Sequence, residues 1–197
     1  MTTKGDRARA RLLDAVARAL VADGYGRMSI AAGARDAGLP RSGFYFYFAS
    51  RGEAVAAVTR GLFEDFAEVA TPWYDHEVGR HRETFSAAMA ATVALWRSRP
   101  ALLLGLVQAA ATDDVARSIW DDWVGSFVAR AVPTIQRTMT ASAPPGVTAE
   151  GLACRLVGLT FAAMQDDVAA LVAGREVSGS VAEELAFVWL RTLYEDA

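Results

Sequence analysis

The sequence has 197 residues, of which 53% are hydrophobic and 22% charged, so it is too apolar for a disordered chain and long enough to bury a substantial core. Its longest apolar stretches, such as residues 101–107, fall far short of the roughly 20 residues that span a bilayer, and its charged start does not resemble a signal peptide. The single cysteine, Cys154, excludes an intramolecular disulfide and a cysteine metal cluster, so we expect a soluble, cytoplasmic protein with no membrane partner and no cofactor.

The net charge of −3 is unevenly distributed along the chain. Residues 1–53 contain nine basic and five acidic side chains, a net charge of +4, whereas residues 54–197 have a net charge of −7. A basic segment joined to an acidic body indicates a part that binds a polyanion and a remainder that does not touch nucleic acid. Chance clustering also produces differences of this size, so charge alone leaves nucleic-acid binding open.

Apolar residues recur at helical spacing along nearly the whole chain, which predicts an all-α fold. In the first helix Leu12, Val16 and Leu20 share a face, and Gly24 is a natural stop. Ser50 and Glu53 form a capping-box pattern that opens the fourth helix, and a loop is expected from Pro72 to Gly79. The nine expected helices cover about residues 6–23, 29–38, 41–47, 51–70, 80–98, 101–111, 113–141, 148–173 and 180–195, with Pro133 expected to kink or divide the seventh.

The segment from Phe44 to Phe48 has the composition of a strand, because its five residues are all aromatic. It is short, and no other segment of the chain offers a partner strand. We therefore expect the neighbouring helices to override its strand propensity.

Residues 29–48 fit a helix-turn-helix, which needs a small residue where the two helices cross and a glycine in the turn between them. Ala34 and Gly38 have the right spacing for these two positions. The second helix of such a unit enters the major groove of DNA, and its outer residues contact phosphates and bases. The candidates on this outer face are Arg41, Ser42, Gly43, Tyr45 and Tyr47.

The run from Phe44 to Phe48, followed by Ser50 and Arg51, resembles the N-terminal motif of TetR-type transcriptional regulators. Together with a weaker C-terminal match at Val188-Trp189 and Leu193-Tyr194, this run is most similar to the EthR branch of that family. The resemblance implies a three-helix DNA-binding domain over residues 1–50 and a helical ligand-binding and dimerisation domain over residues 51–197. It adds Ser29 and Arg51 to the DNA-binding candidates. Three positions depart from the family pattern: Gly33 replaces an apolar anchor, Pro40 a capping hydroxyl, and Gly52 an acidic residue.

The resemblance also implies an apolar effector cavity in the C-terminal body. Aromatic and soft side chains at helical spacing are its candidates, although such residues are more often part of a core. The ligand-binding candidates are Phe85, Met89, Trp96, Gln108, Trp120, Trp123, Phe127, Phe161, Met164 and Trp189. Further hydrogen bonds are available from Thr112, Thr160 and Gln165, and the Asp166–Asp167 pair suits either an amine ligand or a solvated face.

Dimerisation is expected through the last two helices, which each have an apolar stripe. Such a twofold dimer predicts a palindromic double-stranded DNA operator. The stripes consist of Leu152, Leu156, Leu159 and Ala163 on the first helix, and Val181, Leu185, Val188 and Leu193 on the second.

An enzyme is a poor match to this sequence. His76 and His81 are the only histidines, they have no carboxylates at metal-ligand spacing, and there is no phosphate-binding loop or nucleophile elbow. Cys154 lies in an apolar helical stretch, where a buried side chain is expected. The sequence therefore predicts a regulator, most simply a repressor, released from its operator by a hydrophobic small molecule. A helical sensor without DNA binding is the alternative.

Overall fold

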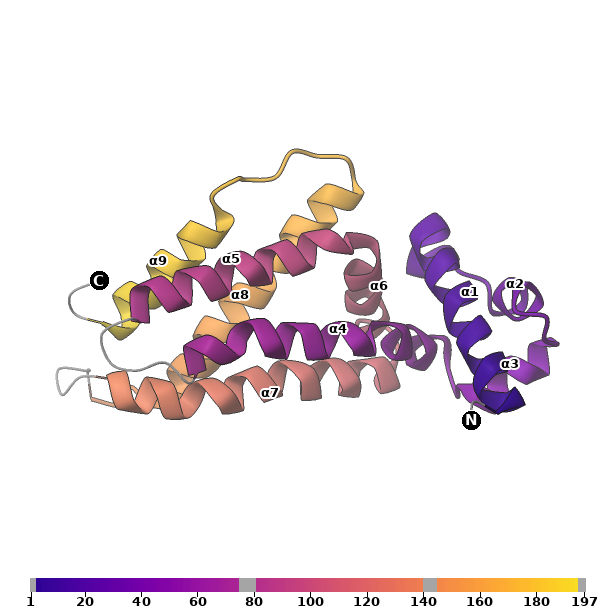
Figure 1. The fold of residues 1–197 in the computed structure, drawn as a ribbon, viewed down its shortest axis with the longest axis horizontal. Coiled ribbons are helices and arrows are strands. Elements are labelled where there is room, and N and C mark those ends of the chain that lie inside the picture. The colour runs from indigo at the N-terminus through magenta and orange to yellow at the C-terminus, as the bar shows by residue number, and fades with distance from the viewer. Residues whose placement is uncertain (1–2, 75–80, 140–144, 195–197) are drawn as a thin grey trace. The chain divides into compact units, whose positions relative to one another are not determined.

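The computed structural model describes residues 3–74, 81–139 and 145–194. Within these ranges the chain forms nine helices and no strand, as the sequence predicts (Figure 1). The helices are α1 (Lys4–Arg27), α2 (Ile30–Asp36), α3 (Arg41–Tyr47), α4 (Arg51–Tyr74), α5 (His81–Ser98), α6 (Pro100–Ala110), α7 (Asp114–Thr138), α8 (Ala149–Val172) and α9 (Val181–Leu193). None of these helices is both long and apolar enough to cross a membrane.

The chain divides into two compact units. The first unit consists of Met1–Leu62 and Arg99–Asp121, and the second of Phe63–Ser98 and Asp122–Ala197. Helix α6 and the start of α7 thus pack with the N-terminal helices, while the longer part of α7 packs with α5, α8 and α9.

In the first unit, α1 packs against α2 and α6 (Figure 1). Leu12 and Leu20 are almost completely buried on α1. Gly105 on α6 allows the close approach of the two helices, because a Cβ at this position would lie 2.5–2.7 Å from the side-chain carbons of Leu20. Gly24 has φ of +72° and interrupts α1 where the sequence places its end, although three helical residues follow.

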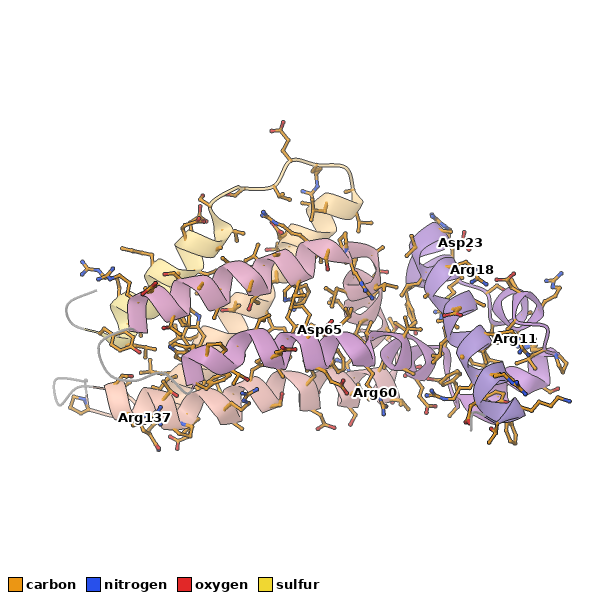
Figure 2. The ribbon with its side chains drawn as sticks, viewed as in Figure 1. Arg11, Arg18, Asp23, Arg60, Asp65 and Arg137 are labelled. Carbon is orange, nitrogen blue, oxygen red and sulfur yellow. The ribbon has the colours of Figure 1, made fainter. Side chains whose placement is uncertain are left out.

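Two arginines of α1 also make polar contacts with α2 and with the residue that follows it. The guanidinium of Arg11 donates to the carbonyl of Ala37 at 3.2 Å, and that of Arg18 pairs with Asp36 at 2.5 Å; both arginines lie on α1 (Figure 2). The Arg18–Asp36 pair is exposed on both sides, so it contributes little to stability.

In the second unit, α5 lies alongside α9 and also contacts α8 (Figure 1). Arg97 on α5 holds Asp167 on α8 through two hydrogen bonds, of 2.7 and 2.9 Å, and donates a third to the carbonyl of Ser178. Asp167 is buried, so this cation is its counter-charge. Asp167 is therefore committed to the fold, and of the pair considered for an amine ligand only Asp166 is exposed.

Helix α4 continues through Pro72 to Tyr74, so residues 72–74 of the predicted loop are helical, whereas residues 75–79 of that loop lie outside the described residues. A proline inside a helix removes one backbone hydrogen bond. Around this point Arg130 supplies others: it donates to the carbonyl of Ala67 at 3.3 Å and to the hydroxyl of Thr71 at 2.8 Å. Its guanidinium also lies 4.5 Å from the ring centre of Tyr74.

Two further expectations differ from the structure. Cys154 is exposed rather than buried. Leu156, Leu185 and Leu193, three of the eight residues in the two stripes assigned to the dimer, are buried inside the subunit and belong to its own core. Pro133 does not divide α7, and His76 and the side chain of His81 lie outside the described residues.

Candidate DNA-binding surface and ligand cavity

Helices α2 and α3 have the local signals that a helix-turn-helix requires. The hydroxyl of Ser29 caps α2 by accepting the N–H of Ala32 at 3.3 Å. The turn is made by Gly38, which has φ of +72°. Pro40 then opens α3 without a side-chain cap, a position that suits proline because the first helical N–H groups have no partner within the helix.

The inner face of α3 is fixed by two phenylalanines. Phe44 and Phe48 are 1% and 2% exposed, and α3 packs against α2, on which the small residue Ala34 is also buried. Their burial explains why this aromatic run forms a helix: every fourth ring enters the core. Arg9 from α1 covers the ring of Phe48, with its guanidinium carbon 5.3 Å from the ring centre.

Several of the predicted contact positions of α3 are exposed. Arg41, Ser42 and Tyr45 are exposed. Gly43 is half-buried, and a Cβ there would lie 3.3 Å from that of Leu39, so its lack of a side chain also serves the turn. Tyr47 is half-buried.

Two of the predicted contact residues take part in the fold. The hydroxyl of Ser29 is occupied as the cap of α2. Arg51 donates to the carbonyl of Met28 at 3.2 Å and lies over the ring of Tyr25, with its guanidinium carbon 4.1 Å from the ring centre. Both residues therefore position the motif.

Phe46 is a surface residue that sequence reasoning missed. It is 82% exposed, the highest exposure among the large hydrophobic side chains reported on the surface of the described chain, and Tyr47 packs edge-on against its ring at 5.0 Å. The signal for its position was present in the sequence: Phe44 and Phe48 are four residues apart, so the residue midway between them faces away from the core.

The second unit contains a cavity of about 70 Å³ with a largely aromatic lining. Its walls come from α4, α5, α7, α8 and α9. The lining residues are Phe66, Ala70, Trp73, Tyr74, Phe85, Ala88, Met89, Thr92, Trp96, Phe127, Val157, Thr160, Phe161 and Trp189. No acidic or basic side chain is among them.

Six of the ten predicted ligand residues line this cavity. They are Phe85, Met89, Trp96, Phe127, Phe161 and Trp189.

Four of the predicted residues lie elsewhere. Trp123 and Met164 are buried in the same unit behind the wall, and Trp123 stacks on Phe63 with the ring centres 4.2 Å apart. Gln108 and Trp120 belong to the first compact unit and do not line the cavity.

Sequence reasoning missed the wall contributed by α4. Phe66, Ala70 and Trp73 recur at helical spacing and signal a helix face. The expected helix ended at about residue 70, before Pro72, so its predicted face did not include Trp73.

Polar groups in the lining differ in their availability. Thr160 is engaged, since it accepts the indole N–H of Trp189 at 3.0 Å and donates to the carbonyl of Leu156. Thr92 donates to the carbonyl of Ala88 at 2.9 Å and retains acceptor capacity. Burial raises the pKa of Tyr74 to about 12, although Arg130 acts in the opposite direction, so its phenol stays protonated at neutral pH.

The geometry thus defines a helical protein with an exposed recognition-type helix in one unit and an uncharged aromatic cavity in the other. The model of the C-terminal domain of the transcriptional regulator EthR matches residues 85–195, more than half of the chain. The chain therefore belongs to the TetR-type transcriptional regulators with an EthR-type C-terminal domain. As in this family generally, its role is regulatory and not enzymatic.

Solved structures share the fold at low sequence identity. A TetR-like transcriptional regulator from Rhodococcus sp. RHA1 is 18% identical with a TM-score of 0.65, and 97% of this chain and 98% of that chain are covered. GusR of Salmonella enterica is 17% identical with a TM-score of 0.64 and 97% coverage of both chains. The multidrug binding protein EbrR, complexed with imidazole, is 19% identical with a TM-score of 0.58 and 94% coverage of both. The comparison with curated proteins gives no significant match.

Proposed function

We propose that this regulator is a cytoplasmic repressor that binds a palindromic operator as a homodimer and is released by an uncharged, hydrophobic small molecule. In this proposal residues 1–50 bind DNA, and residues 51–197 bind the effector and the second subunit. The observation that carries it is the combination of exposed side chains on α3 with an aromatic cavity whose described lining residues include no acidic or basic side chain.

The DNA-binding part of the proposal rests on α3. Arg41, Ser42 and Tyr45 are exposed on α3, and the segment of residues 1–53 has a net charge of +4. Arginine and tyrosine are suited to phosphate contacts, which fix register, and arginine also reads guanine. The exposed ring of Phe46 is suited to the C5-methyl group of thymine, the apolar feature of the major groove.

The effector part of the proposal rests on the cavity lining. A charged ligand entering this site would lose hydration without meeting a counter-charge, since the lining carries none. A cavity of about 70 Å³ is smaller than the roughly 150 Å³ that admits benzene in an engineered protein core, so an effector must displace lining side chains as it enters. Helix α4 contributes four lining residues, so its displacement is the expected response.

The dimer part of the proposal rests on the outer faces of α8 and α9. Leu159 on α8 and Phe187 and Val188 on α9 are 43%, 63% and 39% exposed, respectively. Two copies meeting about a twofold axis would cover these side chains.

Selection from a random-sequence DNA pool tests the proposal. The expected result is a palindromic sequence whose affinity, measured by fluorescence anisotropy, falls steeply between 50 and 200 mM salt, because several phosphate contacts release counter-ions. A panel of uncharged aromatic compounds is then added to the complex, and at least one is expected to release the DNA. Failure to enrich any sequence would favour the sensor without DNA binding, and enrichment without release by any ligand would refute the effector assignment.

A further inference from the structure

Asp113 lies between α6 and α7 and caps the second of these helices. Its carboxylate accepts the N–H of Ala116 at 3.0 Å and also that of Val115. Its own N–H donates to the carbonyl of Ala109 at 2.9 Å, which ties the cap to the end of α6. This much is an ordinary helix cap.

The same carboxylate also lies against the first turn of α4. Its carboxyl carbon would lie 2.4 Å from a Cβ added to Gly52, and the groups that lower its pKa include the hydroxyl of Ser50 and the backbone N–H of Gly52. Ser50 is itself the cap of α4, since its oxygen accepts the N–H of Glu53 at 3.0 Å. One carboxylate therefore joins the first turns of two helices that are some 60 positions apart in the sequence.

Gly52 leaves the space that this arrangement needs. A Cβ at position 52 would lie 2.6 and 2.7 Å from the two carboxylate oxygens of Asp113, distances that real side chains do not adopt. Any other residue at this position would push Asp113 away. The glycine, which departs from the family pattern, is thus matched to an acid supplied by another part of the chain.

The electrostatic environment suits a carboxylate. Each helix N-terminus carries a partial positive charge, and here two of them face the same anion. Burial acts to raise the pKa of Asp113, but the hydrogen bonds from Ala116, Ser50, Gly52 and Val115 together outweigh it, and the pKa lies below its usual range. Asp113 is therefore ionised at neutral pH.

The two joined helices connect Asp113 with both functional parts of the chain. Helix α4 begins four residues after the end of α3, and further along it contributes Trp73 and Tyr74 to the cavity. Helix α7 contributes Phe127. The start of α4 is thus directly connected to the end of α3, and it lies against Asp113 at the start of α7.

We propose that Asp113 is a positioning residue for DNA binding, which fixes the start of α4 to the start of α7 and so sets the orientation in which α3 is presented. This inference rests on the proposed function, since it requires α3 to bind DNA. A shift of α4 on effector binding would reach α3 through this joint.

Amide hydrogen exchange of the DNA-free protein tests the joint itself. In Asp113→Ala we expect faster exchange at Gly52 and Glu53 as well as at Val115 and Ala116. The matched control is Asp114→Ala, which removes the neighbouring exposed acid of α7 and should leave the start of α4 unchanged. Faster exchange confined to α7 in Asp113→Ala would overturn the proposal.

DNA affinity tests the consequence, with the sequence enriched by the wild-type protein as the probe. We expect Asp113→Ala to weaken binding on the order of tenfold, and Asp113→Asn, which keeps an acceptor but loses the charge, to weaken it less. The double variant Asp113→Ala/Gly52→Asp places a carboxylate within α4 instead. It should recover thermal stability through capping but not DNA affinity, because the tie to α7 is still missing.

Recovery of both properties would make Asp113 a simple helix cap and overturn the proposal. Unchanged DNA affinity in a folded Asp113→Ala protein would overturn it as well. If the wild type enriches no DNA sequence, the proposed function fails, and the exchange experiment still decides whether Asp113 joins the two helices.

Discussion

At the scale of single residues, exposure separates the two roles of the aromatic run in α3. Phe44 and Phe48 hold the helix in the core, while Phe46 is 82% exposed two positions from each of them. The cost of presenting a phenylalanine ring to water is understandable if the ring is covered in a complex.

Substituting Phe46 separates DNA recognition from folding. For Phe46→Ala we expect a loss of roughly 1–3 kcal/mol in binding free energy to the selected DNA, with an unchanged unfolding free energy because no buried contact is removed. Anisotropy and urea titration measure the two quantities. The matched variant Phe44→Ala should instead cost about 3–5 kcal/mol of stability, and unchanged DNA affinity in Phe46→Ala would exclude the ring from the interface.

Tyr74 lines the cavity and has a neutral phenol, which we expect to donate a hydrogen bond to a bound ligand. Acetophenone and ethylbenzene differ chiefly by a carbonyl oxygen, and we expect the wild type to prefer acetophenone in calorimetric titration. Tyr74→Phe should abolish this preference, and Thr92→Val should preserve it because Thr92 donates to the Ala88 carbonyl. A preference that survives in Tyr74→Phe would assign the donor to another group.

The same phenol makes stability depend on alkaline pH. Its pKa rises from an ordinary 10 to about 12 on folding, chiefly through burial, so the folded state retains the proton longer than the unfolded state. Its contribution is complete below pH 10 and is lost as the pH approaches 12. We expect the unfolding free energy to fall by about 2 kcal/mol over this range, and by less in Tyr74→Phe. Burial also raises the pKa of Tyr194, which adds a slope of the same sign in both proteins. Equal slopes in both proteins would contradict the assignment.

At the scale of elements, Arg97 joins α5, α8 and the segment before α9 through three hydrogen bonds. Its partner Asp167 has a side chain only 6% exposed, so removing the cation leaves a buried charge. Arg97→Met should cost about 3–5 kcal/mol in chemical denaturation, and Arg97→Met/Asp167→Leu clearly less. Arg18→Met breaks the exposed pair with Asp36 and should change stability by less than about 1 kcal/mol. Equal losses of stability in Arg97→Met and Arg18→Met would show that burial does not determine how much each ion pair contributes.

The elements that could be predicted from the sequence are those with local signals. Ser29 caps α2, Gly38 makes the turn and Pro40 opens α3, and each acts on residues within a few positions of itself. The bounds of α3, Arg41–Tyr47, are accordingly the predicted ones. The end of α4 could not be predicted in this way, because its last turns are bonded by Arg130, which donates to the carbonyl of Ala67, 63 positions earlier in the chain, and to the hydroxyl of Thr71.

The aromatic character of the cavity could be predicted from the sequence, but the complete set of residues that line it could not. Helical spacing shows which residues share a face, and it correctly brings Phe85, Met89 and Trp96 to one wall. It does not show which neighbour that face meets. The prediction that Gln108 and Trp120 line the cavity is therefore wrong, because their segments pack in the other unit.

At the scale of the whole molecule, the proposed dimer has a direct test in Phe187. Phe187→Glu places a charge at the most exposed apolar position of α9, and we expect it to convert a dimer to a monomer in analytical ultracentrifugation. Val21→Glu introduces the same charge at a 62% exposed position on α1 and should leave the dimer intact. A dimeric Phe187→Glu protein would place the interface elsewhere.

The aromatic lining has a practical consequence as well. Trp73, Trp96 and Trp189 are three of the five tryptophans of the chain, and all three border the cavity. A molecule that enters must displace or touch indole rings, so occupancy alters the protein's own ultraviolet emission. Intrinsic tryptophan fluorescence therefore reports ligand binding directly. Libraries of candidate effectors can be screened in this way without a label and without knowledge of the operator.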